Sequence, residues 1–280
     1  MKIDAWNIDV GTAAVSAEEF GQQILARVEE SWADGADLVL LPEYSWMGAE
    51  RFLQGEARGV ADWFWQDFLP QHRTRLLSPG KAVVLGTVPV LTEDGEMRNR
   101  APIFADGEEF FQDKLALTPW EDLMQGGKEL RVWQFGGLRL AVLVCLDIEV
   151  PEWSVLLRDQ AVDLILVPSA TENLMGVERI NRCASARAVE LGCVVVVAHL
   201  LGMTESSLVD ENRGCLSVYL PSQSATIELE REWRTEVHGG GNLRHRIELD
   251  EGLRCQLMSA KRETNPALLT RESLGGVRVC

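Results

Sequence analysis

The sequence predicts an α/β protein, because short runs of valine and leucine alternate along the chain with longer segments of helical periodicity. The clearest strand is Leu138–Val144, and Pro151 marks the start of the helix that follows it. Two more strands share the pattern Asp-Leu-[Val/Ile]-Leu-[Leu/Val]-Pro, at residues 37–42 and 163–168. The repeat predicts two related halves that face one cleft, although a chance match of short apolar strands explains it equally well.

Composition and charge narrow the class of protein. The chain has 280 residues, enough for one large α/β domain, with 46% hydrophobic and 25% charged residues. Its formal charge of −16 argues against nucleic acid or an anionic membrane surface as the main partner. No stretch approaches the roughly 18 to 20 apolar residues of a membrane span. The N-terminus also lacks the apolar core of a signal peptide, so we expect a cytoplasmic protein.

The cysteines are scattered and do not form a pattern. There are six, with no C-x-x-C pair, and the chain has four histidines. This usage indicates neither a disulfide framework nor a zinc site. The cysteines are Cys145, Cys183, Cys193, Cys215, Cys255 and Cys280.

The first elements follow from periodicity and capping. Lys2–Asp9 has strand character, and the capping box at residues 16–19 predicts a helix through about Trp32. A second strand at residues 37–42 is followed directly by Glu43. The residues expected on the buried face of the helix are Phe20, Ile24, Leu25 and Val28.

The middle of the chain contains a second helix and three strands. We predict the helix from about Ala57 to Leu76, with strands at residues 81–90 and 100–105 and another that ends at Lys114. The helix carries an aromatic patch that we assign to the core or to a subunit interface rather than to a cofactor site. The patch consists of Trp63, Phe64, Trp65 and Phe68.

The last third begins with a helix at residues 173–191 and a buried strand at 193–200, and strands are expected from Gly214 onward. We interpret Asp250-Glu251-Gly252 as a hairpin turn between strands at 243–249 and 253–259. No polar linker divides the chain, so we predict one domain over residues 1–260 and a C-terminal tail at 261–280.

Three residues at predicted strand ends carry reactive groups: Glu43, Lys114 and Cys145. A cysteine thiol is mostly protonated at neutral pH, so nucleophilic catalysis needs a base and a positive charge that stabilises the anion. Glutamate can supply the first and lysine the second, and no histidine stands nearby in the sequence. The alternatives are a buried structural cysteine and a solvated loop glutamate, and spacing alone does not join the three residues.

From about residue 3 to 220 the chain resembles the nitrilase, or carbon–nitrogen hydrolase, superfamily. The resemblance rests on three motifs in the right order: L-L-P-E-Y at residues 40–44, D-K-L-A-L-T-P-W-E at 113–121 and C-L-D-I-E-V-P-E at 145–152. The segments between them match as well, including G-T-V-P-V at 86–90, N-R-A at 99–101 and A-R-A-V-E-L-G-C at 186–193.

Details of these motifs favour one branch of the superfamily. The lysine motif and residues 171–190 look most like the branch that is often fused to an acetyltransferase domain. Plant-type nitrilases tend to follow the cysteine with tryptophan and glutamate, whereas Leu146 and Asp147 follow it here. The resemblance therefore favours amides over nitriles as substrates.

The resemblance also implies a mechanism that needs neither a metal nor an organic cofactor. Glu43 would act as the base, and Lys114 with the backbone N–H of Leu146 would stabilise the oxyanion. Glu121 matches the additional glutamate of the family, and its alternative is an exposed residue that opens a turn. The side chains expected to form the pocket walls are Tyr44, Trp120, Ser169, Ala170 and Thr171.

The fold implied by the resemblance is a four-layer α-β-β-α sandwich that forms a homodimer, or a higher homo-oligomer, through helices, and in some members of the family the C-terminal tail crosses to the partner. The function implied is hydrolysis of a small linear amide. Alternatives are nitrile hydrolysis or acyl transfer on the same fold, and a catalytically silent binding or scaffold protein.

Several neighbouring residues have more than one interpretation. We expect Asp147 to cap the following turn or pair with an arginine, and Glu149 to point either to solvent or into the site. Arg187 and Glu190 are expected to form a structural ion pair. His199 and Leu191 stand where related sequences often have asparagines, which predicts a change in packing behind the site or at the subunit interface.

Overall fold

The protein is described from a computed structural model, which places residues 1–206 and 208–260. The tail predicted at residues 261–280 lies outside this range. Within the described residues no helix is both long enough and apolar enough to cross a bilayer.

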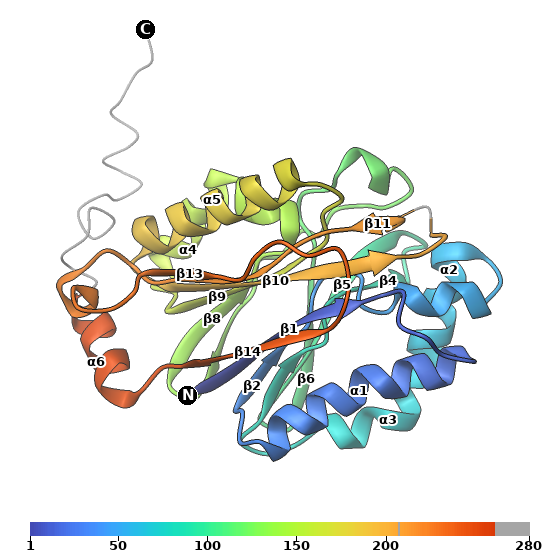
Figure 1. Cartoon of the computed structure of the whole chain (residues 1–280), viewed down its shortest axis with the longest axis horizontal. Coiled ribbons are helices and arrows are strands. Elements are labelled where there is room, and N and C mark those ends of the chain that lie inside the picture. Colours follow the sequence, from blue (N-terminus) through green and yellow to red (C-terminus); the bar gives the residue numbers. More distant parts are fainter. Residues whose placement is uncertain (207, 261–280) are drawn as a thin grey trace, which may run out of the picture.

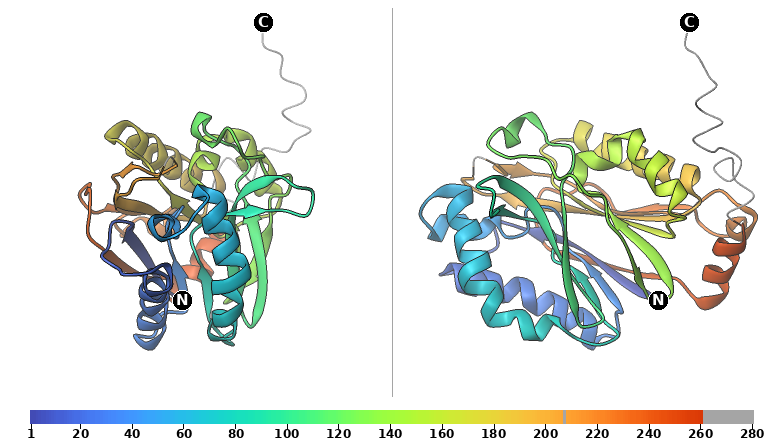
Figure 2. Two further views of the ribbon diagram at one scale, coloured as in Figure 1. Left: turned by 90° about the vertical axis from the view of Figure 1, so that its right-hand side faces the viewer. Right: turned by 180° about the vertical axis from the view of Figure 1, so that it is seen from behind.

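Two β layers lie face to face, and helices cover the outer face of each layer (Figure 1). Helices α1 (Ala17–Ala33) and α3 (Leu69–Leu76) cover one layer, and α4 (Pro151–Asp159) and α5 (Leu174–Leu191) cover the other. Figure 2 shows the same order of layers from the side and from behind. The predicted α-β-β-α sandwich is therefore confirmed.

The first layer has the strand order β4-β5-β3-β2-β1, with β6 added on β5 and β14 on β1. Strands β1, β2 and β3 are parallel, and the outer pairings are antiparallel. The bounds are β1 Lys2–Asp9, β2 Leu38–Leu40, β3 Ala82–Val84, β4 Val88–Leu91, β5 Met97–Ala105, β6 Glu108–Asp113 and β14 Leu243–Glu248.

The second layer has the order β7-β8-β9-β10, followed by β12 and β13, and β11 pairs with the end of β10. The layers join where β1 and β10 run parallel, and the register there covers two residue pairs, Ile8 with Leu200 and Asp9 with Leu201. The bounds are β7 Val132–Phe135, β8 Leu138–Val142, β9 Leu164–Ser169, β10 Val194–Met203, β11 Glu211–Asn212, β12 Leu216–Tyr219 and β13 Glu232–Arg234.

The core follows the alternation of side chains along the strands. In β2, Leu38 and Leu40 pack between the two layers, whereas Val39 and Leu41 pack toward α1. All four side chains are fully buried. This explains why the strand is apolar at every position.

The aromatic patch of the second helix belongs to the core. Trp46 is fully buried, and the ring centroids of Phe64 and Phe68 lie 4.6 Å and 5.4 Å from its ring. The helix predicted at 57–76 is divided into α2 (Glu56–Asp62), a π-helical turn at Trp63–Phe68 and α3. The π turn accommodates these large rings.

The repeated Asp-Leu pattern occupies equivalent places in the two layers. Each copy forms a central strand, β2 or β9, with a parallel neighbour on both sides. Asp37 Oδ2 accepts the N–H of Lys2 and Asp163 Oδ2 accepts the N–H of Arg139, both at 2.8 Å. The two strands therefore end toward the same region between the layers.

Two predictions about secondary structure were wrong. The strand expected at 81–90 is interrupted, because Gly86 has a φ of +67° and separates β3 from β4. The hairpin expected around residue 251 is instead the start of helix α6 (Glu251–Ala260). Asp250 Oδ1 accepts the N–H of Leu253 at 2.7 Å, so the residue read as part of a turn caps a helix. Strand β7 was not predicted at all.

Gly86 offers a test of how closely the strand ends are packed. A Cβ at this position would lie 2.0 Å from the carbonyl oxygen of Pro42, whereas a Cβ at Gly80, with a nearly identical φ of +68°, would meet nothing within 4 Å. We expect Gly80→Ala to lower the free energy of unfolding by about 1 kcal/mol, the cost of a left-handed alanine. Gly86→Ala should cost about 3 kcal/mol or more.

Urea denaturation followed by far-UV circular dichroism measures both variants. Equal losses of stability would show that the contact between Gly86 and Pro42 does not constrain the fold.

Candidate active site

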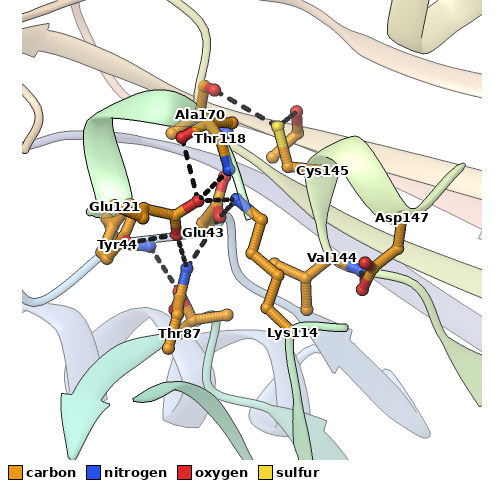
Figure 3. Close-up of polar contacts among 12 residues, drawn as sticks. Glu43, Tyr44, Thr87, Lys114, Thr118, Glu121, Val144, Cys145, Asp147 and Ala170 are labelled. Carbon is orange, nitrogen blue, oxygen red and sulfur yellow. Dashed lines mark hydrogen bonds and ion pairs between the residues drawn. The ribbon is translucent and has the colours of Figure 1, made fainter. Parts of the chain in front are cut away.

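Four strand ends bring polar side chains to one place between the two layers. Glu43 follows β2 and Lys114 follows β6 in the first layer, whereas Cys145 follows β8 and Ala170 follows β9 in the second. Figure 3 shows these side chains converging, with the Lys114 ammonium directed at the two glutamates and Cys145 beside them. The structure thus brings together the three residues that were selected from separate parts of the sequence.

The ammonium of Lys114 lies between two carboxylates. Its Nζ is 2.8 Å from Glu43 Oε1 and 2.7 Å from Glu121 Oε2. All three side chains are at most 2% exposed. Asn99 Nδ2 donates to Oε1 of both glutamates, at 2.8 Å for Glu43 and 3.0 Å for Glu121. Two carboxylates and one ammonium thus share a water-excluded site with a formal charge of −1.

Glu121 is held on its other side by the 3₁₀ turn that contains it. The N–H and Oγ1 of Thr118 both donate to Glu121 Oε2 at 2.9 Å, and the Tyr44 hydroxyl donates to Oε1 at 2.6 Å. Glu121 is therefore a buried member of the cluster and not an exposed residue of a turn. Trp120, its neighbour, is 67% exposed.

Cys145 sits at a strained bend. Its φ is +48°, in the left-handed region that residues other than glycine rarely adopt, and its side chain is almost fully buried. The hydroxyl of Ser169 donates to Sγ at 3.3 Å, and the thiol donates to the carbonyl oxygen of Ala170 at 3.4 Å. The N–H of Ala170 donates to Glu43 Oε2 at 3.0 Å, which ties the cysteine side of the site to the glutamate side.

The surroundings of the two glutamates shift their pKa values in opposite directions. Burial raises the pKa of Glu43, and the positive charge of Lys114 opposes this only in part. Burial acts in the same direction on Glu121, but Lys114 and the hydrogen bonds from Tyr44 and Thr118 outweigh it, so the pKa of Glu121 is lowered. Glu43 is therefore suited to exchange protons, and Glu121 remains a permanent carboxylate.

The thiol and the ammonium respond to the same charges. Burial, and then the negative charge of Glu43, raise the pKa of Cys145 to about 12, whereas Lys114 lowers it. Burial would lower the pKa of Lys114, but Glu43 and Glu121 reverse this effect and raise it. At neutral pH the resting site therefore holds a thiol and a charged ammonium.

Asp147 caps the 3₁₀ turn that contains it, in line with one of its two predicted interpretations, and also binds the segment after Lys114. It accepts N–H groups of Leu115 at 3.1 Å, Ala116 at 2.7 Å and Val144 at 3.1 Å. Burial raises its pKa to about 7, against the effect of these bonds. Its bond to Val144 closes the turn at the cysteine, while the other two hold the segment after Lys114. The carboxylate pairs with backbone groups and not with an arginine.

A cavity of about 140 Å³ opens at Cys145. Four of the five expected wall residues line it, together with the expected oxyanion donor Leu146, whereas Ser169 is fully buried and donates to the sulfur. Glu149 also faces this cavity, which decides between its two predicted orientations. The five lining residues are Tyr44, Trp120, Leu146, Ala170 and Thr171.

Three further predicted positions are structural. Arg187 Nη1 lies 2.8 Å from Glu190 Oε2, which confirms the expected ion pair. His199 is fully buried with Nδ1 2.8 Å from the carbonyl oxygen of Cys215, and burial lowers its pKa to about 4, so the ring is neutral at pH 7. Leu191, the last residue of α5, packs into the core.

Sequence reasoning missed the role of Asn99. The residue was noted only as part of N-R-A, yet it bridges both glutamates. Its neighbour Arg100 binds Asp113 through two bonds of 2.6 Å and 3.0 Å, which fixes β5 against β6 and thereby places Lys114. The sequence signals for this role were the amide of Asn99 and the pair of Arg100 and Asp113 next to the site residues. These side chains come together only through the register between β5 and β6.

Within residues 1–206 and 208–260, no group of three or more His, Cys, Asp or Glu side chains is arranged to hold a metal ion.

Comparison with known proteins gives the family. The model of the carbon–nitrogen hydrolase family matches residues 8–219. A probable hydrolase, YhcX, of Bacillus subtilis is 27% identical over 216 residues, covering 74% of this chain and 42% of that protein. A deaminated glutathione amidase of Synechocystis sp. is 30% identical over 182 residues, covering 58% of this chain and 64% of that protein. The matches thus span less than two thirds of either relative.

Solved structures share the fold. An amidase from Nesterenkonia sp. has a TM-score of 0.69 at 21% identity, covering 91% of this chain and 92% of that one. A mutant of the Nesterenkonia sp. AN1 amidase in complex with butyramide has a TM-score of 0.66 at 22% identity, covering 91% and 93%. Saccharomyces cerevisiae Nit3, a member of the nitrilase superfamily, has a TM-score of 0.68 at 18% identity, covering 96% of each chain.

The effect of the Glu43 charge on the pKa of the Cys145 thiol can be tested directly. In Glu43→Gln the carboxylate that raises the pKa of Cys145 is gone while Lys114 still attracts the thiolate, so we expect the pKa of Cys145 to fall. The rate of alkylation by iodoacetamide as a function of pH, read from the Cys145 peptide by mass spectrometry, should therefore rise at lower pH than in the wild type.

The exposed Cys255 in the same sample serves as the internal control and should keep its profile. A profile of Cys145 that stays in place or moves to higher pH would show that Glu43 does not act on the sulfur through its charge.

The role of Asp147 predicts a graded loss of stability. Asp147→Ala leaves three backbone N–H groups without their acceptor, and we expect the free energy of unfolding to fall by about 3 kcal/mol or more. Asp147→Asn keeps one acceptor oxygen and should lose less. Urea denaturation ranks the two variants, and equal losses would mean that side-chain volume, not hydrogen bonding, accounts for the effect.

Proposed function

The chain belongs to the carbon–nitrogen hydrolase family of the nitrilase superfamily, and we propose that it is a cysteine amidase that hydrolyses a small linear amide. One observation carries the proposal. A buried thiol adjoins two glutamates that share one ammonium, and the pKa of one glutamate is raised while that of the other is lowered. Because their pKa values are shifted in opposite directions, Glu43 is suited to transfer protons, whereas Glu121 keeps its negative charge.

The first step is attack by sulfur. Glu43 accepts the proton of the Cys145 thiol as Sγ bonds to the amide carbonyl carbon, and the carbonyl π electrons move to oxygen. The high pKa of the resting thiol keeps the sulfur protonated until a substrate is present. A base with a raised pKa beside the sulfur lowers the cost of this transfer.

The oxyanion that forms needs donors. The ammonium of Lys114 is held within the cluster, and the N–H of Leu146 belongs to the residue directly after the nucleophile on a cavity wall. Donors of this kind are typically worth about 3 to 4 kcal/mol each in the transition state. Because Glu121 and Asn99 fix the ammonium and Glu43, no large rearrangement is required.

Collapse of the tetrahedral species breaks the C–N bond. Glu43 returns its proton to the departing nitrogen, which leaves as ammonia or an amine, and Cys145 holds the acyl group as a thioester. Water then attacks the thioester while Glu43 takes one of its protons, and the carboxylic acid leaves as the thiol is restored. Atoms balance with water as the second substrate.

The proposed substrate is small because the cavity is small. A volume of about 140 Å³ suits a short acyl chain. The complex of the related Nesterenkonia amidase with butyramide supports a short aliphatic amide as the first compound to test.

Release of ammonia from butyramide tests the proposal. We expect Cys145→Ala to abolish it and Lys114→Ala to lower kcat about 100-fold or more, since an oxyanion donor and the partner of two buried carboxylates are lost together. Cys255→Ala removes an exposed thiol and should retain wild-type activity.

Full activity of Cys145→Ala would contradict the nucleophile, and turnover of Lys114→Ala within a few-fold of the wild type would contradict the oxyanion role. Circular dichroism of each variant distinguishes a chemical defect from unfolding. Formation of a hydroxamate when hydroxylamine is added would support the thioester, because hydroxylamine intercepts an acyl group held on Cys145.

A further inference from the structure

The cavity contains a second group of charged side chains beyond the reactive cluster. Glu149 ends the 3₁₀ turn that begins with Cys145, Glu172 lies just before the cap of α5, and Arg179 lies in the second turn of that helix. The side chain of Glu149 is 20% exposed, so its carboxylate is partly withdrawn from water. These residues line the same cavity as Cys145.

The cation in this group is already paired. Arg179 Nε lies 3.3 Å from Glu149 Oε2, so Glu149 neutralises part of its positive charge. The Arg179 side chain is 63% exposed, so solvent screens this charge as well. Among the described residues that line the cavity, four carboxylates face two cations. The cavity as a whole is therefore negative, as is the protein, with a formal charge of −16.

The N-terminus of α5 could in principle offset this charge, because the positive end of a helix dipole favours anions. Its cap already uses two of the backbone donors, since Asn173 Oδ1 accepts the N–H of Met175 at 3.0 Å and of Gly176 at 3.2 Å. Glu172 precedes the cap and already places a negative charge at this end. An anionic substrate would therefore find these backbone N–H groups already bound to Asn173, and the excess of carboxylates would repel it.

We propose that the enzyme selects short amides that carry a protonated amine at the end opposite the amide group, and that Glu149 and Glu172 are the residues that select them. The inference rests on the proposed amidase function and adds the charge of the substrate to it. A partly desolvated carboxylate attracts an ammonium more strongly than one in bulk water does, and a negative cavity raises the local concentration of cations.

Three amides of similar length but different charge test this selection. They are 4-aminobutanamide, which is cationic at pH 7, pentanamide, which is neutral, and succinamic acid, which is anionic. We expect kcat/KM, from ammonia release at low ionic strength, to be about tenfold higher for the cation than for the neutral amide, and lowest for the anion. Added salt should reduce the preference.

Substitutions should move the preference in opposite directions. Glu149→Gln and Glu172→Gln should each lower the ratio of kcat/KM for the cationic over the neutral amide several-fold. Arg179→Gln should raise it, because it removes a positive charge and frees Glu149. The ratio is the readout, so a general loss of activity in a variant does not affect the result.

Glu178→Gln provides a matched control. Glu178 lies next to Arg179 on α5 but pairs with Arg182 at 2.7 Å and faces a different depression. Its substitution also removes one negative charge, from a position next to Arg179, and should leave the ratio unchanged.

The results of these assays either support or overturn the proposed selection. Hydrolysis of pentanamide or succinamic acid as fast as 4-aminobutanamide overturns the selection and leaves the amidase function standing. The selection is also overturned if Glu149→Gln and Glu172→Gln change the ratio no more than Glu178→Gln does. If none of the three amides releases ammonia, both the amidase function and the selection are overturned.

Discussion

The structure depends on the burial of one ammonium, that of Lys114, between Glu43 and Glu121. Withdrawing an ion from water costs several kcal/mol, and this cluster withdraws three. The cost is offset only because each charge has a close partner and the remaining acceptor positions are filled by Asn99 and Tyr44. Removing the ammonium would leave two carboxylates buried without compensation. The strands that supply these residues must therefore meet in one register, and the reactive geometry and the stability of this region have a common cause.

Much of this arrangement follows from local sequence. The face of α1 and the apolar strands at residues 37–42 and 163–168 are set by short-range periodicity, and Glu43, Lys114 and Cys145 each stand where a strand ends. The rest depends on contacts between distant segments. Asn99 reads only as a buried strand residue until β5 pairs with β6, where its carbonyl oxygen accepts the N–H of Lys114. Asp250 suits a turn or a helix cap equally well, and packing of the following leucines decides for the helix.

The two layers contribute different chemistry. The charged cluster of Glu43, Lys114 and Asn99 belongs entirely to the first layer, whereas Cys145 and Ala170 belong to the second. Few polar contacts described above cross from one layer to the other. They are the bond from the N–H of Ala170 to Glu43 and the bonds from Leu115 and Ala116 to Asp147. Sulfur and base are thus aligned by the docking of two sheets.

The division of the site between the two layers has a consequence for a chain that is not completely folded. A chain whose layers have not yet docked holds a thiol without a proton acceptor and a lysine–glutamate cluster without a nucleophile. On the proposed mechanism neither part alone can form the thioester. Hydrolysis would therefore require that both layers are docked.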